Sequence, residues 1–175
     1  MNLTSELPML IREEVPADRD SVYTVNFAAF GTRAEAELVE QLRRDDQVIV
    51  SLVATVHDGV VGHVLFCDLQ VNSPGSSFTG AALAPLAVLP AYQNRGIGSR
   101  LAQQGIQACR NAGVDIVLVV GDPRYYRRFG FTSVLAANLT TPYSGESLMA
   151  LKLSYGALNI DRAIVDYPDA FSHVS

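Results

Sequence analysis

Hydrophobic residues recur along this chain at two spacings, and each spacing predicts one kind of secondary structure. Alternating or continuous apolar runs are typical of strands, whereas apolar positions three or four residues apart are typical of helices. These patterns predict strands near 9–15, 47–56, 60–71, 81–90, 115–121, 131–136 and 148–153, and helices near 17–30, 33–44, 97–112 and 123–129. The segments show neither an internal repeat nor a linker, so their order indicates one α/β domain.

Short polar signals mark the ends of several of these elements. Asp58-Gly59 between two β-rich runs predicts a hairpin, and Thr32 is placed to cap the helix that follows it. Asp122-Pro123 has the form of an N-cap followed by proline in the first helical position. Pro85 cannot donate a hydrogen bond to a neighbouring strand, so a bulge or a break is expected there. The polar run 72–80 predicts a loop.

Composition narrows the class of protein. With 175 residues, 49% of them apolar and 18% charged, the chain has enough apolar material for one globular core. The net charge of −5 argues against a nucleic-acid binder, which usually carries a basic excess. No apolar run approaches the roughly 18 residues of a membrane span, and residues 1–10 lack the basic start and apolar centre of a signal peptide. We therefore expect a cytoplasmic protein with no membrane or nucleic-acid partner.

The two cysteines and three histidines indicate neither a disulfide framework nor a metal site. Cys67 and Cys109 lie in apolar segments, so we expect buried free thiols, which suit a reducing compartment. The histidines are scattered and no zinc-ligand spacing occurs, so no metal is expected.

The stretch 86-LAVLPAYQNRGIGSRL-101 carries the clearest chemical signal, because two glycines one residue apart stand at the start of a helix. The first backbone N–H groups of a helix have no internal partner, and the helix dipole adds partial positive charge there. Gly96 and Gly98 would let a phosphate approach these groups without a Cβ in the way, and Arg95 adds a formal charge. The alternative is a tight strand-to-helix turn in which the glycines only relieve crowding.

Two well-known phosphate motifs do not fit this stretch. A Walker loop needs Lys-Ser or Lys-Thr directly after its last glycine, whereas Ser99-Arg100 follows here. A dinucleotide fingerprint needs a small residue three places beyond the second glycine, where this chain has Leu101. A nucleotide-binding α/β domain is therefore disfavoured.

The pattern that remains, Gln93-x-x-Gly96-x-Gly98 after a broken apolar strand, resembles the signature Q/R-x-x-G-x-G/A of the GCN5-related N-acetyltransferases, the GNAT family. The later run 126-YRRFGF-131 matches that family's Y-x-x-x-G-F, and the order of elements fits the family fold from about residue 9 to 153. More narrowly, 121-GDPRYYRRFGF-131 and 167-YPDAF-171 resemble a bacterial branch of uncharacterised members, the YhbS-like group.

This resemblance implies a fold, a donor and a set of binding residues. The fold would be a single GNAT-like domain over residues 1–175, with a core over about 9–153 and a C-terminal extension over 154–175. Its mixed, mostly antiparallel sheet would contain one splayed parallel pair of strands. Acetyl-CoA would be the acyl donor, with its pyrophosphate at the glycine turn and its pantetheine arm along 84–90. The residues expected to bind it are Leu86, Ala87, Val88, Gln93, Asn94, Arg95, Gly96, Ile97, Gly98, Ser99 and Tyr126.

Acetyl transfer to an amine needs a positioned acceptor, a stabilised oxyanion and a proton for the leaving thiolate. A backbone N–H of Ala87 or Val88 could face the thioester oxygen at the strand break. Tyr126 is the expected general acid, because a phenol with a pKa of about 10 keeps its proton at neutral pH and the resemblance puts Tyr126 at the family's usual acid position. The alternative for Tyr126 is a packing role alone. Tyr125 is next to it on the helix and is expected to point elsewhere.

The general base is left open by the sequence. Each candidate carboxylate or imidazole could equally be a solvated surface group, and a chain of waters could serve instead. The candidates are Glu13, Glu14, Glu35, Glu37, Asp68 and His63. Arg124, Arg127 and Arg128 could meet cofactor phosphates, although a run of charges more commonly forms a solvated helix face.

The acceptor is expected to be a primary amine of a small molecule or a protein, and the acidic balance weakly favours a basic or neutral amine. Its surface should come from the first two helices, the run 72–80 and the segment near Tyr143. The alternative function is a non-catalytic acyl-CoA-binding sensor or interaction module of the same fold. Dimers are common in the resembling family, so a homodimer is consistent with the resemblance, although the sequence shows no interface.

Overall fold

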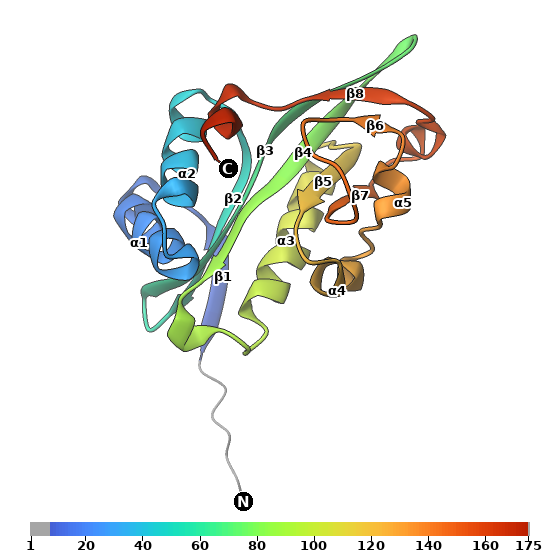
Figure 1. Ribbon diagram of the computed structural model, residues 1–175. Helices are drawn as coiled ribbons and strands as arrows, with labels where there is room; N and C mark the ends of the chain where they lie inside the picture. Colours follow the sequence, from blue (N-terminus) through green and yellow to red (C-terminus); the bar gives the residue numbers. More distant parts are fainter. Residues whose placement is uncertain (1–7, 175) are drawn as a thin grey trace, which may run out of the picture.

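The computed structural model describes residues 8–174, which form an eight-stranded sheet flanked by helices (Figure 1). The strands are β1 Met9–Glu13, β2 Val48–Val56, β3 Gly59–Ser73, β4 Ser76–Val88, β5 Ile116–Val120, β6 Leu139–Thr140, β7 Leu148–Lys152 and β8 Ala163–Asp166. The α-helices are α1 Arg19–Phe30, α2 Ala34–Arg44, α3 Ile97–Asn111, α4 Pro123–Tyr126 and α5 Ser133–Ala136. Short 3-10 turns are η1 Pro16–Asp18, η2 Pro90–Tyr92, η3 Arg127–Phe129, η4 Gly156–Asn159 and η5 Asp169–His173.

Strands β1 to β4 follow one another as an antiparallel meander. The β2–β3 turn consists of His57 and Asp58, whose φ angles of 48° and 62° are those of the tight turn that Asp-Gly favours. This confirms the predicted hairpin. Strands β4 and β5 are parallel, and β5 then pairs antiparallel with β7. The sheet is therefore mixed and mostly antiparallel, as expected.

The helices cover the two faces of the sheet, and each face has its own core. Figure 1 shows α1 and α2 on one side and α3 on the other. On the first side Val22, Leu38 and Leu42 pack against alternate residues of β2 and β3. On the second side Leu101 and Ile106 do the same against the remaining residues. Because successive strand residues point to opposite faces, a continuous apolar run such as β3 supplies both cores.

The parallel pair β4–β5 separates soon after it begins. Its register runs from Gly80 opposite Ile116 only to Ala82 opposite Leu118, after which β4 continues without a partner on that side. Near Pro85 two residues of β4 lie against one of β3, since Leu83 is opposite Phe66 and Leu86 is opposite Val64. The bulge predicted from Pro85 is confirmed. The result is a wedge-shaped opening between the ends of β4 and β5.

The tail of the chain returns to the sheet. Strand β8 pairs antiparallel with β3 around Val71–Val165 and parallel with β6, and η5 packs against α2. Figure 1 shows this final segment crossing back from β8 to lie beside α2. Side chains after residue 160 therefore reach the same face as α1 and α2.

Two predicted elements were wrong. Residues 72–80 are not a loop, because β3 runs to Ser73 and β4 begins at Ser76, leaving a tight turn at Pro74-Gly75. Residues 131–136 are not a strand: Thr132 makes one isolated bridge to Ala150, and its hydroxyl then accepts from the Leu135 N–H to start helix α5. At 72–80 the pairing of β3 with β4 outweighs local composition. At 131–136 the local cap by Thr132 starts a helix in place of a strand.

The remaining predicted elements agree with the structure within a few residues. The N-cap of α2 is Arg33 rather than Thr32, although the Thr32 hydroxyl still accepts from the Ala34 N–H at 3.4 Å. Asp122 caps α4 with Pro123 in its first turn, as predicted. Within residues 8–174, none of the helices combines the length and the apolar character required to cross a bilayer.

Candidate active site

The turn before α3 leaves the start of that helix open. Asn94 and Gly96 both have positive φ angles, 62° and 79°, and Gly96 is the N-cap with no side chain bonded to the helix end. The first backbone bond of the helix runs from the Arg100 N–H to the Gly96 carbonyl at 3.1 Å. The N–H groups of residues 97–99 therefore have no partner within the helix, and they lie at the positive end of a 15-residue dipole.

Gln93 ties this turn to the free edge of β4. Its amide nitrogen donates to the Val88 carbonyl at 3.0 Å. The Leu89 N–H bonds to Val61 across the β3–β4 pair, and bonding alternates along an antiparallel pair. Leu86 and Val88 therefore direct their backbone groups away from β3 and into the opening, whereas Ala87, opposite His63, directs its own toward β3. Of the two N–H groups expected to face a thioester, only that of Val88 lies at the opening.

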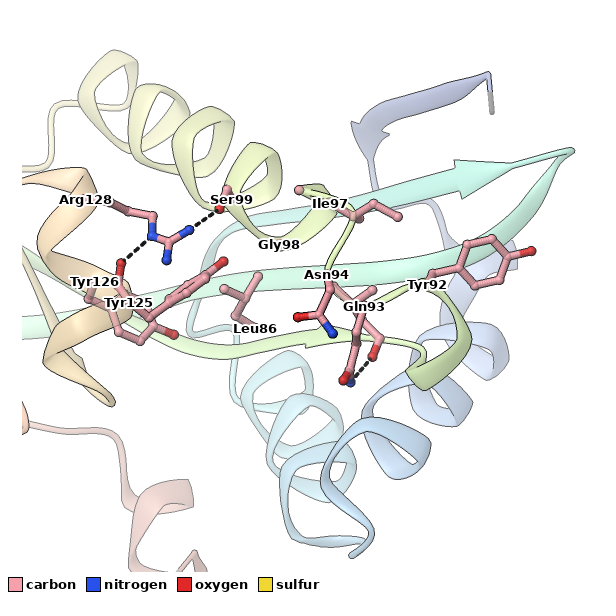
Figure 2. A pocket seen from close by; sticks show the side chains of 12 residues that line it. Leu86, Tyr92, Gln93, Asn94, Ile97, Gly98, Ser99, Tyr125, Tyr126 and Arg128 are labelled. Atoms are coloured by element: carbon pink, nitrogen blue, oxygen red, sulfur yellow. Dashed lines mark hydrogen bonds between the residues drawn. The ribbon is translucent and has the colours of Figure 1, made fainter. Parts of the chain in front are cut away.

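A cavity of about 580 Å³ lies between the turn, the end of β4 and the segment after β5 (Figure 2). We call it the α3 cavity. Its lining residues are Leu86, Val88, Tyr92, Gln93, Asn94, Gly96, Ile97, Gly98, Ser99, Tyr125, Tyr126 and Arg128. Nine of the eleven residues expected at the cofactor site are in this list. Ala87, which is buried, and Arg95, whose guanidinium lies over the Tyr92 ring at 5.5 Å, are not.

Gly98 lies close to the opposite wall of the cavity. A Cβ added there would lie 2.8 Å from the Tyr125 hydroxyl and 3.7 Å from a Val88 methyl group. Gly96 has no atom within 4 Å of an added Cβ, so its requirement is the positive φ angle. The two glycines therefore serve different purposes: Gly96 shapes the turn, and Gly98 keeps the cavity clear.

Arg128 brings positive charge to the helix start. Its guanidinium donates to the Tyr125 carbonyl at 2.9 Å and to the Ser99 hydroxyl at 3.4 Å, and it lies 4.4 Å from the centre of the Tyr125 ring. Figure 2 shows this side chain reaching from η3 to the first turn of α3. Arg124 instead pairs with Asp122 at 3.0 Å. One arginine of the predicted run thus lies at the cavity.

Tyr126 lies against Gly121 and makes edge-to-face contacts with Tyr125 and Phe131, with ring centres 5.0 and 5.9 Å apart. Burial, with a smaller contribution from Tyr125, raises the pKa of Tyr126 to about 12. The phenol therefore keeps its proton throughout the neutral range. The expectation that Tyr125 points elsewhere was wrong, because both rings line the α3 cavity beside Leu86 (Figure 2).

A second cavity, of about 500 Å³, lies on the other face of the sheet opening. We call it the α1–α2 cavity. Its lining residues are Phe30, Glu35, Leu38, Ala82, Leu83, Ala84, Pro85, Leu86, Leu118, Val119, Val120, Gly121, Asp122, Tyr126, Tyr143, Tyr167, Phe171 and Val174. The predicted contributions of α1, α2 and the Tyr143 segment are thus present. Residues 72–80 do not line it, because they form the projecting β3–β4 turn, and the tail from Tyr167 takes their place.

Leu86 and Tyr126 line both cavities. The two spaces therefore meet through the opening where β4 and β5 separate. Two molecules, one in each cavity, would therefore come closest to each other next to the Tyr126 side chain.

The base candidates are in different surroundings. Glu35 lines the α1–α2 cavity, whereas Glu37, on the same helix, faces a third cavity beside the tail. Glu13 and Asp68 line neither of the two cavities that meet at Tyr126. His63 is fully buried and Glu14 nearly so.

Glu14 and His63 belong to a buried polar network between the sheet and the first two helices. The Asn26 amide donates to His63 Nδ1 at 3.1 Å, so Nε2 carries the proton and faces Ser51 Oγ at 2.9 Å. Ser51 in turn donates to Glu14, which also pairs with Arg43. Burial lowers the pKa of His63, so the ring is neutral. For Glu14 burial would raise the pKa, but its bonds to His63 and Ser51 and the charge of Arg43 lower it.

Both cysteines are buried free thiols, as predicted. Burial raises the pKa of Cys67 and of Cys109 to about 12, and neither lines either of the two cavities. Neither thiol is placed to act as a nucleophile, since the thiolate is the reactive form.

The site contains residues that sequence reasoning missed. Tyr92 and Tyr125 were not expected at the α3 cavity, and neither was the aromatic group of Phe30, Tyr167 and Phe171 at the α1–α2 cavity. The position of Tyr125 next to Tyr126 was no signal, because neighbouring side chains on a helix point about 100° apart. Nothing local marks the other aromatic residues, which come together only through the fold.

Comparisons with known proteins show the family of the chain. Residues 11–134 match the family profile described as acetyltransferase (GNAT) domain. The chain is 33% identical over 167 residues to the uncharacterised N-acetyltransferase YhbS of Escherichia coli K12, covering 94% of this chain and 99% of that protein. It is 38% identical over 117 residues to the uncharacterised N-acetyltransferase YjhQ of the same organism, covering 66% of this chain and 65% of that protein.

Two solved structures extend the likeness. The crystal structure of E. coli YhbS in complex with CoA has a TM-score of 0.86 and 32% identity, covering 97% of this chain and 94% of that one. A GNAT family acetyltransferase from Brucella melitensis in complex with acetyl-CoA has a TM-score of 0.79 and 31% identity, covering 94% of this chain and 99% of that one. The separated β4–β5 pair, the glycine turn before α3 and these matches lead to one conclusion: the chain belongs to the GNAT family of N-acetyltransferases.

Proposed function

We propose that this protein transfers the acetyl group of acetyl-CoA directly to a primary amine, with Tyr126 as general acid. The observation that carries the proposal is the meeting of two cavities at Leu86 and Tyr126. A transferase that forms no covalent intermediate needs its two substrates in contact, and two spaces open to opposite faces of one sheet provide that contact.

The α3 cavity suits the donor. Its unpartnered helix N–H groups and the Arg128 guanidinium are suitable ligands for a pyrophosphate. The open edge of β4 offers the backbone groups of Leu86 to an amide group of a pantetheine arm. CoA and acetyl-CoA are the ligands of the two similar crystal structures, which supports the same donor here.

The chemistry then needs few groups of this chain. The amine attacks in its neutral form: its nitrogen forms a bond to the thioester carbon while the carbon–sulfur bond breaks. The nitrogen then loses one proton to solvent water, from which Tyr126 regains the proton that it gives to the sulfur. The Val88 N–H, which faces the sheet opening, would donate to the carbonyl oxygen as negative charge develops there. Tyr126 gives its proton to the leaving sulfur, and its raised pKa keeps that proton available at neutral pH. The buried, protonated cysteines agree with direct transfer without an acyl-enzyme.

The test is CoA release measured as free thiol with acetyl-CoA and a broad panel of primary amines. Amine-dependent release with an acetylated amine as product supports the proposal. Tight acetyl-CoA binding with no release across the panel would instead identify a non-catalytic acyl-CoA sensor of the same fold.

A further inference from the structure

The α1–α2 cavity has an aromatic wall built from separate parts of the chain. Tyr143 and Tyr167 have ring centres 5.0 Å apart, and Tyr167 and Phe171 have theirs 5.2 Å apart, in edge-to-face contacts. Phe30, at the end of α1, completes the wall and is 42% exposed. Tyr143, Tyr167 and Phe171 are partly buried. One exposed and three partly buried rings gathered around one hollow indicate a surface that binds an apolar group.

The floor of the same cavity is also apolar. It consists of β4 from Ala82 to Pro85 and the end of β5 from Leu118 to Val120, where Val120 is 48% exposed. A volume of about 500 Å³ lies within the range of small-molecule sites. The cavity is therefore large enough for one ring and a short chain.

The charges at this cavity are negative. Its lining, as far as the described residues show, contains Glu35 and Asp122 but no lysine, arginine or histidine. Asp122 is already occupied, since it accepts from the Arg124 backbone at 2.9 Å and pairs with the Arg124 guanidinium. Glu35 accepts from the neutral Thr32 hydroxyl at 3.0 Å, and no cation among residues 8–174 pairs with it. One carboxylate is thus free to meet one cation.

We propose that the α1–α2 cavity binds an arylalkylamine, a primary amine on a short chain ending in an aromatic ring, with Glu35 meeting the ammonium group and the aromatic wall holding the ring. As a substrate assignment the inference rests on the proposed function. A polyamine, an aminoglycoside or a basic peptide would bring several charges to a cavity that offers one unpaired carboxylate and would set the others against apolar side chains. An anionic acceptor would meet Glu35 and Asp122.

The binding test uses calorimetric titration of the full chain saturated with CoA. Phenethylamine is the probe, and 2-phenylethanol, butylamine and spermidine are matched probes that lack the charge, lack the ring or add charges. We expect phenethylamine to bind at least about 10-fold more tightly than each of the three. Equal or tighter binding of butylamine or spermidine would overturn the inference.

Two pairs of variants separate the charge from the ring contact. Glu35→Gln should weaken phenethylamine about 10-fold and leave 2-phenylethanol unchanged, whereas Glu37→Gln, which lies outside the cavity, should change neither. Phe30→Ala should weaken both probes a few-fold, whereas Phe27→Ala, which removes an equally exposed ring outside the cavity, should not. Acetyl-CoA affinity should stay constant in all four. Unchanged phenethylamine binding in Glu35→Gln would overturn the assignment of Glu35.

Turnover then distinguishes this inference from the proposed function. Phenethylamine binding with no acetyl transfer to it or to any other amine of the panel would leave the binding inference intact and overturn the proposed function. Efficient acetylation of spermidine, with phenethylamine neither bound nor acetylated, would support the proposed function and overturn this inference.

Discussion

The two cavities that meet at Tyr126 are built in different ways. The α3 cavity comes mainly from one continuous stretch, Leu86–Ser99, and its key groups are backbone N–H and C=O groups held by a turn and a strand edge. The α1–α2 cavity comes from α1, α2, two strands, the Tyr143 segment and the tail, and its key groups are side chains. A site made of backbone groups is encoded locally, whereas a site made of side chains depends on the whole fold.

The largest effect is expected at the junction of the two cavities. Replacing Tyr126 with phenylalanine removes the proton donor but keeps the ring packing, so kcat should fall about 100-fold while acetyl-CoA affinity changes little. Initial rates and a calorimetric titration measure the two quantities. Tyr125→Phe is a comparison inside the α3 cavity alone, and it should lower kcat less than about threefold. An unaltered kcat in Tyr126→Phe would remove this residue from the mechanism.

The same residue gives a pH prediction. Since burial raises the pKa of Tyr126 to about 12, the protonated form persists as the pH rises, and kcat should show no loss from this group between pH 7 and 10. Absorbance titration of ionised tyrosine in the wild type and in Tyr126→Phe measures the pKa directly. A group that ionises near pH 10 and is lost in the variant would contradict the buried position of Tyr126.

The next largest effect is expected for a substitution that changes the α3 cavity alone. Gly98→Val puts a branched side chain where a single Cβ already lies 2.8 Å from the Tyr125 hydroxyl, and it fills the space beside the helix N–H groups. Acetyl-CoA should bind about 10- to 100-fold more weakly, corresponding to 1–3 kcal/mol of steric cost. Gly59→Val, at the exposed start of β3, is the control and should leave the affinity unchanged. Wild-type affinity in Gly98→Val would argue against the α3 cavity as the donor site.

The next prediction concerns how folding stability depends on pH, because the buried network beside α1 and α2 contains titratable groups. The folded-state pKa values of His63 and Glu14 both lie below their unfolded values, so the unfolded chain gains protons first as the pH falls. Stability should therefore be complete above about pH 6.5 and decrease below it, by up to about 1.4 kcal/mol per pH unit for one histidine. Glu14 adds a further loss near pH 4.5 and below.

Urea unfolding at several pH values between 7.5 and 5 measures this dependence. His63→Gln should flatten the slope between pH 6.5 and 5.5, whereas His173→Gln, an exposed histidine in the tail, should keep it. The flattening is the readout, since the variant's absolute stability also includes the cost of a disturbed network. The same slope in the wild type and in His63→Gln would show that His63 does not cause it.

The smallest effect concerns the hydrogen bond that joins the glycine turn to β4. Gln93→Ala removes the donor to the Val88 carbonyl, which should weaken acetyl-CoA binding by a factor of about 2 to 10, the value of one hydrogen bond. Gln103→Ala, on the exposed side of α3, should have no effect. Calorimetric titration of both variants shows whether acetyl-CoA binding depends on this hydrogen bond.

The features that could be predicted from the sequence are mainly those that form the α3 cavity. The Gln93–Gly98 turn, the Asp58-Gly59 hairpin and the Asp122 cap were predictable because short-range geometry fixes each of them. The bulge at Pro85 was predictable because proline has no N–H. These features position the α3 cavity almost completely.

The errors arose where distant partners decide the structure. Residues 72–80 have loop composition, yet β3 and β4 pair through them and β8 adds bonds at Val71. The side chains around Phe171 could not be predicted to reach Phe30, because the tail returns across the sheet only in the folded chain. For the same reason the acceptor's chemistry was not visible in the sequence.

The central claim is that the start of α3 is a binding site and not only a structural turn. Thermal unfolding of the purified chain with acetyl-CoA, CoA, NADH or ATP tests it most directly. A ligand at 100 times its dissociation constant adds about 2.7 kcal/mol, which for a chain of this size raises Tm by roughly 5–10 °C. The account predicts this shift with acetyl-CoA and CoA alone. It also predicts that the stabilisation falls to about 0.4–1.4 kcal/mol in Gly98→Val at the same ligand concentrations, because binding there is 10- to 100-fold weaker. A shift only with NADH or ATP, or no shift with any of the four, would contradict it.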